Sequence, residues 1–129
     1  MNITQKSLPT FEAKIYVGLR KRYTETLCKP IQVWNICQYA VAKGWCLTYT
    51  PTEFIYTPTY TTGSNCCAGS EPGYIIGAIN YPRFPVEVAL LKERVLDLAR
   101  MLLVELDQTR ISVVFTDETV MLEQNEERV

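Results

Sequence analysis

The sequence predicts one α+β domain whose elements follow in the order β-α-β-β-α-β, the ferredoxin-like plan in which two helices cover one face of a sheet. Three observations predict this fold. Residues 11–22 and 110–116 alternate apolar and polar side chains, as half-buried strands do. Residues 30–43 and 86–107 repeat apolar side chains at helical spacing. Turn-forming residues at 57–72 separate two further strands in the middle of the chain.

The first strand is expected over Phe11–Arg22 and the first helix over Pro30–Lys43. The fixed φ of Pro30 suits the first turn of a helix, and Gly44 supplies a C-terminal stop. One face of the strand carries Phe11, Ala13, Ile15, Val17 and Leu19, and the helix repeats Ile31, Trp34, Cys37 and Val41.

The second strand is the least regular of the expected elements. Trp45–Tyr49 and Glu53–Thr57 are rich in Thr, Tyr and Trp, which favour strands, but Pro51 interrupts them. The segment is therefore either one strand with a bulge or a strand at the edge of the sheet. After a long hairpin loop at 57–72, Gly73–Asn80 is apolar on both faces and is expected to form a buried central strand.

The second half of the chain is expected to add a helix, a strand and a short extra strand. The helix runs over about Val86–Asp107, the strand over Arg110–Thr116, and Val120–Leu122 adds the short strand after a turn. The domain is expected to span residues 11–123, with a flexible arm at 1–10 and a flexible tail at 124–129. The seam of the helix is Val88, Leu91, Val95, Leu98 and Leu102.

The two helices leave one face of the sheet uncovered, and Tyr16, Tyr49 and Tyr74 are expected on that face. Large aromatic side chains on an uncovered face favour burial against another subunit. The sequence therefore predicts a homo-oligomer with cyclic symmetry, either a dimer, a trimer or a hexamer.

Composition narrows the classes of partner and compartment. The 129 residues carry a net charge of −1 and the pI is near 5.5, which disfavours binding to bulk nucleic acid. The polar N-terminus lacks a signal-peptide pattern and no apolar run reaches the roughly 20 residues of a membrane helix, so a cytoplasmic protein without membrane partners is expected. Basic residues gather in 1–45 and acidic residues in 84–129, which indicates a dipolar solvated surface, a cationic pocket or a head-to-tail subunit contact.

The chain contains no histidine, which removes most general-base, nucleophile-activating and zinc chemistry. The five cysteines lack zinc-ligand spacing, so Cys37 is expected in the core and Cys66 and Cys67 as incidental loop thiols. The sequence therefore predicts a protein that binds a ligand without catalysis, metal or cofactor. The alternative is a Mg²⁺-dependent activity through Asp117 and Glu118, which otherwise form an ordinary turn.

Residues suited to an anionic, aromatic ligand follow the first and third predicted strands. Arg20 and Arg22 suit phosphate, unless they are a solvated strand end. In the segment Asn80–Phe84, the amide of Asn80 suits a base or ribose edge, while two aromatic rings suit stacking and an arginine lies beside a helix N-terminus. The alternative for this segment is a proline-stiffened connection with Phe84 as a hydrophobic staple.

Arg110 either closes an anion site or caps the second helix. Together these features indicate a site for a nucleotide, between subunits if the protein is an oligomer. The predicted ligand-binding residues are Arg20, Arg22, Tyr74, Asn80, Tyr81, Arg83, Phe84, Arg110 and Asp117.

The order of elements resembles the trimeric PII and CutA groups of ferredoxin-like proteins. The segments KIYVGLRKRYTE, GYIIGAINYPRF and RISVVFTDETVML resemble the small phage-encoded anti-Thoeris sponges. That resemblance implies an oligomer in the bacterial host cytoplasm that sequesters a cyclic ADP-ribose-type immune signal, or cyclic oligonucleotides, without turnover. It matches Arg20, Asn80 and Arg110 to the polar residues of the family's pocket.

Three other functions are compatible with the same residues. The first is a PII-like regulatory or protein-interaction module that uses the long loop. The second is a metal-dependent phosphodiesterase, and the third is an assembly protein whose whole function is to oligomerise.

Overall fold

A computed structural model describes residues 1–22, 24, 26–55 and 70–124. Its five-stranded antiparallel sheet has the strand order β2-β3-β1-β4-β5. This arrangement confirms the predicted α+β fold with two helices and an extra C-terminal strand. The strands are β1 Glu12–Gly18, β2 Leu47–Ile55, β3 Ser70–Ile79, β4 Arg110–Phe115 and β5 Thr119–Glu123, and the helices are α1 Pro30–Ala42 and α2 Val88–Glu105.

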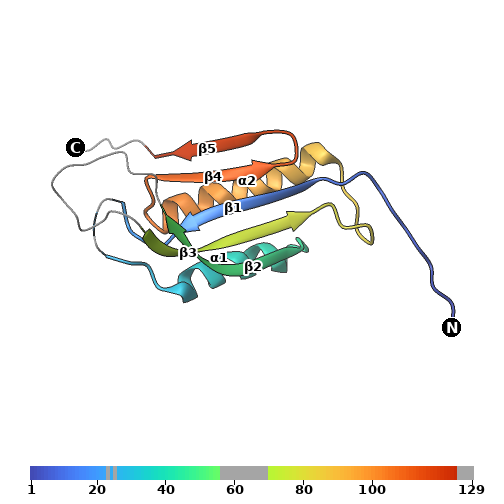
Figure 1. Cartoon of the computed structure of the whole chain (residues 1–129), viewed down its shortest axis with the longest axis horizontal. Coiled ribbons are helices and arrows are strands. Elements are labelled where there is room, and N and C mark those ends of the chain that lie inside the picture. The colour runs from blue at the N-terminus through green and yellow to red at the C-terminus, as the bar shows by residue number, and fades with distance from the viewer. Residues whose placement is uncertain (23, 25, 56–69, 125–129) are drawn as a thin grey trace.

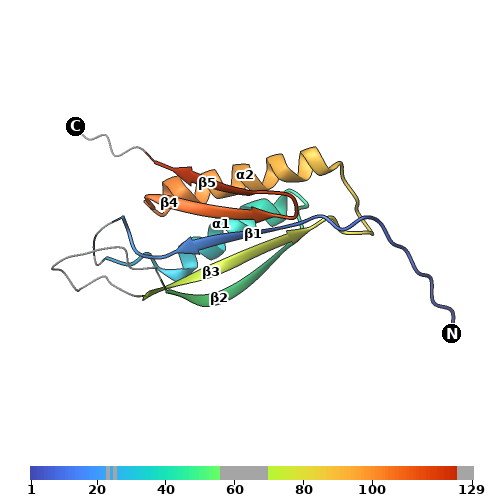
Figure 2. The same cartoon turned by 45° about the horizontal axis from the view of Figure 1, so that its top comes forward.

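Both helices lie on the same side of the sheet, behind the strands in Figure 1 and again in the turned view of Figure 2. Helix α2 contacts β1, β4 and β5, and α1 contacts α2. The opposite side, called the open face below, carries no helix of the described chain. Two layers therefore enclose one core, and the open face is the side of the sheet that no helix of the described chain covers.

The central strand β1 confirms the predicted alternation. Ala13, Ile15 and Val17 are at most 1% exposed and face the helices. Leu98 and Leu102 of α2 are also fully buried in the same core. Complete burial of a side chain of this size contributes about 1.5–3 kcal/mol, so this layer is the main source of stability.

Strand β2 is an edge strand without a bulge, which decides between the two alternatives for this segment. All nine of its residues pair in unbroken register with β3, and Pro51 lies opposite Tyr74. An edge strand tolerates proline because one of its sides has no hydrogen-bonding partner. Strand β3 begins at Ser70 and not at Gly73, and β1 ends at Gly18 and not at Arg22.

Two expectations about faces are wrong. Tyr49 and Tyr74 lie on the helix-covered face, because the register places them opposite Ile76 and Val17, whose side chains point into the core. Only Tyr16 lies on the open face. The rings of Tyr49 and Tyr74 lie 4.4 Å apart, and the Tyr49 hydroxyl donates to the Pro30 carbonyl at 3.2 Å. Burial, and then the hydrogen bond with Tyr74, raise the pKa of Tyr49.

Helix α1 buries a different set of apolar residues from the set that the sequence analysis named. Of the residues named from the sequence, Cys37 is confirmed in the core, while Ile31, Trp34 and Val41 are between 44% and 54% exposed. The helix is apolar on more than one side, so periodicity does not choose its buried side. In α2 the predicted seam holds except at Val88, its first residue, which is 42% exposed. The buried stripe of α1 is Val33, Ile36, Cys37 and Ala40.

Parts of the sequence-based prediction lie outside the described residues. These are most of the hairpin loop at 57–72, with Cys66 and Cys67, and most of the tail at 124–129. Residues 1–10 carry no helix or strand, and that they form a flexible arm stays a prediction. Neither helix of the described chain is long and apolar enough to cross a membrane.

The Leu98→Ala substitution should destabilise the fold by about 2–5 kcal/mol, because it leaves a cavity at a fully buried position between α2 and the sheet. Urea denaturation followed by circular dichroism would measure this change. Val104→Ala is the matched control, because Val104 lies on the same helix and is 61% exposed. Equal stability of the two variants would contradict the assigned core.

Candidate functional site

The predicted ligand-binding residues lie at two opposite ends of the sheet. Because β1 and β3 are antiparallel, Gly18 pairs with Gly73 at one end and Glu12 pairs with Ile79 at the other. A strand of seven residues separates the two ends by about 20 Å. One chain therefore does not bring all nine residues into one pocket. Arg20, Arg22, Tyr74 and Arg110 lie at the first end, and Asn80, Tyr81, Arg83, Phe84 and Asp117 lie at the second.

At the first end, a buried carboxylate lies against the backbone of β1. Glu71 is only 4% exposed, and strand alternation places its side chain on the open face, opposite to that of Tyr74. A Cβ atom at Gly18 would lie 1.6 Å from Glu71 Oε2, so the carboxylate occupies the space above this glycine. Only glycine at position 18 is compatible with this placement of Glu71.

Arg20 holds this carboxylate in place, and Gln108 in turn holds Arg20. The Arg20 amide donates to Glu71 Oε2 at 3.3 Å, and Arg20 Nε lies 3.5 Å from Oε1. The buried Gln108 side chain donates to the Arg20 carbonyl at 2.8 Å. A buried charge is costly unless it is paired or hydrogen-bonded, and this arrangement supplies both. These residues, Gly18, Arg20, Glu71, Gly73 and Gln108, are called the Glu71 site below.

Sequence reasoning missed Glu71 and Gln108. Glu71 stands alone beside the long loop, and Gln108 lies in the short connection between α2 and β4. The alternation of side chains along β3 could have located Glu71. It lies on the same side of the strand as Gly73 and Ile75, which is the face that the helices leave open.

Two residues beside the Glu71 site have left-handed backbone conformations. Arg22 has a φ of 45° and Asp107 a φ of 53°, and neither is a glycine. The Arg22 amide donates to the Asp107 carbonyl at 3.0 Å, and the two side chains form an ion pair. Such conformations cost about 1–3 kcal/mol each and gather at functional sites.

Arg110 and Tyr74 lie at the same end of the sheet, but the contacts described for them are with residues outside the Glu71 site. Arg110 Nε donates to Glu123 Oε2 at 2.6 Å across β4 and β5. The guanidinium is about half exposed. Tyr74 packs on Tyr49, on the face opposite Glu71.

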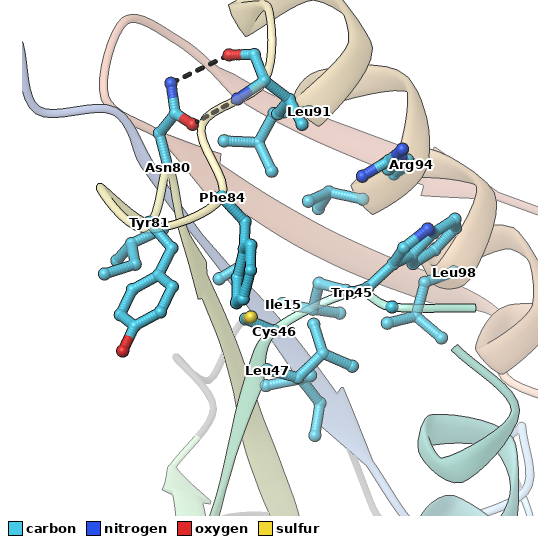
Figure 3. Close-up of a pocket in the computed structure, with 16 residues that line it drawn as sticks. Ile15, Trp45, Cys46, Leu47, Asn80, Tyr81, Phe84, Leu91, Arg94 and Leu98 are labelled. Atoms are coloured by element: carbon cyan, nitrogen blue, oxygen red, sulfur yellow. Dashed lines mark hydrogen bonds between the residues drawn. The ribbon is translucent and has the colours of Figure 1, made fainter. Parts of the chain in front are cut away.

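At the second end, the Asn80 side chain joins the end of β3 to the start of α2. Its amide donates to the Val86 carbonyl at 3.0 Å and accepts from the Val86 amide at 2.9 Å, as the dashed lines of Figure 3 show. The Tyr81 and Phe84 rings lie 5.9 Å apart, and the Arg83 guanidinium lies 5.2 Å from the Phe84 ring centroid. The Asn80 side chain therefore stabilises this connection, while the rings of Tyr81 and Phe84 are exposed.

A mainly apolar pocket opens beside this connection and is called the Trp45 pocket below. Sixteen residues line it, from β1, β2, β3, α2 and the α1–β2 and β3–α2 connections. Figure 3 shows Trp45 and Arg94 on one side and Tyr81 and Phe84 on the other. The Arg94 guanidinium lies 5.6 Å from the Trp45 ring centroid.

Asp117 and Glu118 are bound by a lysine. Lys92 Nζ lies 3.1 Å from Asp117 and 2.6 Å from Glu118. The hydrogen bond with Glu118 is the largest cause that raises the pKa of Lys92. No group of three or more His, Cys, Asp or Glu side chains suited to a metal ion occurs among the described residues.

No protein-family model and no curated protein sequence matches this chain. Two solved structures share its fold over nearly the whole length. A phage SAM lyase in complex with S-methyl-5'-thioadenosine has a TM-score of 0.74 and 14% identity, covering 99% of this chain and 100% of the other. The apo state of a phage SAM lyase gives the same TM-score and identity over 98% and 100%. At this identity the similarity establishes the fold.

These matches correct three expectations. The prediction of a sponge without turnover is wrong, as is its PII-like alternative, because both of these matching structures are of a phage SAM lyase. The prediction that the chain is not an enzyme is wrong on the same finding. The resemblance to phage proteins is supported at the level of fold, and the anti-Thoeris family is not supported.

Thiol alkylation tests whether Cys28 and Cys37 are buried and Cys46 is exposed, as the structure has them. Burial raises the pKa of Cys37 to about 11 and also raises the pKa of Cys28, so both thiols should stay protonated at about pH 8. Cys46 is exposed at the Trp45 pocket. Iodoacetamide should therefore alkylate Cys46 before Cys28 and Cys37 in the native protein, as measured by peptide mass spectrometry. Labelling of Cys37 as fast as Cys46 would sink this assignment.

Proposed function

We propose that this protein is a lyase that acts on S-adenosylmethionine (SAM) or a closely similar sulfonium nucleoside, with the Glu71 site as its reaction centre. The observation that carries the proposal is the whole-chain similarity to a phage SAM lyase with bound S-methyl-5'-thioadenosine. The same similarity supports a phage origin and a small nucleoside ligand. If the proposal is right, the residues of the Glu71 site must suit the cleavage of SAM.

The two molecules define which bond breaks. S-Methyl-5'-thioadenosine keeps the methyl and adenosyl groups of SAM on sulfur. The bond from sulfur to Cγ of the methionine portion is therefore broken, and sulfur keeps the electron pair and becomes a neutral thioether. Since a lyase adds no water, the four-carbon fragment must form its own new bond.

The simplest balanced step is attack by the carboxylate of the substrate on its own Cγ, which closes a five-membered lactone. The nucleophile is already an anion and the leaving group is neutral, so no side chain has to donate or remove a proton. A chain without histidine can therefore carry out this reaction. The protein contributes by holding carboxylate and Cγ together in a site where water is excluded.

Glu71 suits the cationic groups of this substrate. SAM carries a sulfonium and an ammonium group, and a carboxylate of low exposure attracts them strongly because little water screens it. Arg20 acts as a positioning residue, since its amide and guanidinium both approach the Glu71 carboxylate. Gly73, two residues from Glu71 on the same side of β3, adds no side chain of its own beside the carboxylate.

The strained pair Arg22 and Asp107 supports this location. Their left-handed conformations are held by the backbone and side-chain contacts between them, directly after the segment that carries Arg20. The contacts fix the path of the chain from Gly18 to Arg22 and with it the position of the Arg20 amide. The two strained backbone conformations would therefore serve to keep the Arg20 amide hydrogen-bonded to the Glu71 carboxylate.

We propose in addition that the open face packs against other copies of the chain. The register aligns one uncharged row across all five strands, so a second copy covers apolar surface without burying charge. The Glu71 site lies at the border of that row, where an adjacent copy would shield it from water. The row consists of Thr50, Ile75, Tyr16, Ser112 and Met121.

The first prediction concerns catalysis. Incubation with SAM should release S-methyl-5'-thioadenosine and a lactone, both identified by mass spectrometry. Glu71→Gln should lower kcat/KM by about a hundredfold or more, because it removes a charge of low exposure that faces the cationic substrate. Arg20→Lys should retain part of the activity that Arg20→Met loses.

Glu53→Gln is the matched control, because Glu53 lies on the neighbouring strand and is exposed. Its activity should equal that of the unaltered protein. No product from the unaltered protein, or full activity of Glu71→Gln, would refute the proposal. Incorporation of heavy oxygen from labelled water into the four-carbon product at the time of cleavage would indicate a hydrolase instead.

The second prediction concerns assembly. Sedimentation velocity should detect a homo-oligomer, and Ile75→Lys should shift it toward monomer because it places a charge in the uncharged row. The control is Val104→Lys, an equal change on the exposed side of α2. An unaltered sedimentation coefficient for Ile75→Lys would exclude the open face as the interface.

A further inference from the structure

The connection between α2 and β4 contains two residues that differ from the usual choice at a helix end. The Asp107 and Gln108 amides donate back to the Val104 and Leu103 carbonyls at 3.2 and 3.0 Å, which is the pattern of the Schellman motif. The first of these positions takes a left-handed conformation and is usually glycine, and the second often packs an apolar side chain on the helix. This chain has Asp107, with a φ of 53°, and then the buried Gln108. Neither side chain is needed to end the helix, so each needs another explanation.

Both side chains contact the segment that carries Arg20. Asp107 forms the ion pair with Arg22, and Gln108 Nε2 donates to the Arg20 carbonyl at 2.8 Å and to the Leu106 carbonyl at 3.2 Å. Arg20 lies two residues beyond the end of β1, so the pairing of that strand does not by itself fix the Arg20 backbone. The hydrogen bonds of Gln108 therefore join the end of α2 to the backbone that contacts Glu71.

Gln124, directly after β5, holds Gln108 from the other side. Its Nε2 atom donates to the Gln108 carbonyl at 2.8 Å and to the Leu103 carbonyl at 3.2 Å. A series of hydrogen bonds therefore runs from the end of β5 through Gln108 to the backbone of Arg20, whose amide lies 3.3 Å from Glu71 Oε2. An apolar residue at position 108 would fill the same core without making this connection.

We propose that Gln108 is a positioning residue of the Glu71 site. By holding the Arg20 carbonyl, it keeps the amide of the same residue on Glu71 Oε2 and so fixes where the carboxylate meets a cationic ligand. Gln124 acts in the same way, one step further from the site. The proposal rests on the lyase function proposed above, because the sulfonium and ammonium groups of SAM are the cations that this carboxylate would meet.

Gln108→Met tests the proposal, because methionine has a similar length and no hydrogen-bond donor. This substitution should lower kcat/KM for SAM by about tenfold or more, since the carboxylate is no longer held where the substrate needs it. Gln124→Met should cause a smaller loss in the same direction. Gln38→Met is the matched control and should leave kcat/KM unchanged, because Gln38 lies on the exposed side of α1.

A double-mutant cycle distinguishes positioning from a general loss of structure. In the Glu71→Gln background, the further change Gln108→Met should lower kcat/KM by less than about twofold, because no charge is left to position. A residue that merely supports the fold would cause the same loss in both backgrounds. That result would overturn the proposal.

Amide hydrogen exchange followed by NMR gives a readout that does not depend on catalysis. Gln108→Met should speed exchange of the Arg20 amide by about tenfold or more, because the bond from this amide to Glu71 would open more often. The Leu106 amide, which donates to the Leu102 carbonyl at 3.0 Å, should keep its original rate. Equal acceleration of both amides would mean that the end of α2 has loosened, and an unchanged Arg20 amide would mean that Gln108 does not hold it. Either result refutes the positioning role.

Failure of this proposal can be told apart from failure of the lyase proposal. If the unaltered protein cleaves SAM and Gln108→Met is equally active, only the positioning role is refuted. If the unaltered protein does not cleave SAM, the lyase proposal is refuted, and exchange of the Arg20 amide then decides whether Gln108 positions the carboxylate.

Discussion

The alternation of apolar and polar side chains along β1 determines which face of the sheet every other strand buries. This strand pairs with β3 on one side and β4 on the other, so its apolar residues anchor the core beneath the helices. The residues between them are forced onto the open face, and the pairing register then assigns a face to every residue of the neighbouring strands. Gly18 and Glu71 meet because of that assignment. The place of the proposed reaction centre therefore follows from which residues of β1 face the helices.

Strong periodicity made most of the fold predictable from the sequence. The seam of α2 and the alternation of β1 are each satisfied by one face only, and both predictions hold, apart from the exposed first residue of α2. Helix α1 is different, because a second apolar stripe with the same spacing competes with the one named first. Tyr49 and Tyr74 were expected on the wrong face, because composition alone does not say which side of β2 and β3 meets the helices. The unbroken register of β2 settles their faces.

The candidate site was less predictable, because its parts come together only through pairing of distant segments. Arg20 was found as a cation at a strand end, but its partner Glu71 lies 51 residues further along the chain. Asn80–Phe84 attracted attention as a cluster in sequence, and in space it borders a separate pocket. The sequence also encouraged an argument from missing catalytic groups. Such an argument is valid only for reactions that need a proton moved, and the substrate of a lyase can contain both its own nucleophile and its own leaving group.

The close approach of Glu71 to Gly18 makes position 18 an indicator of where the carboxylate lies. Any side chain at position 18 needs the space that the carboxylate fills, so even a methyl group there would displace the Glu71 carboxylate from the Arg20 amide. In a related sequence, a residue larger than glycine at position 18 would therefore be a sign that the acidic side chain of β3 is held differently.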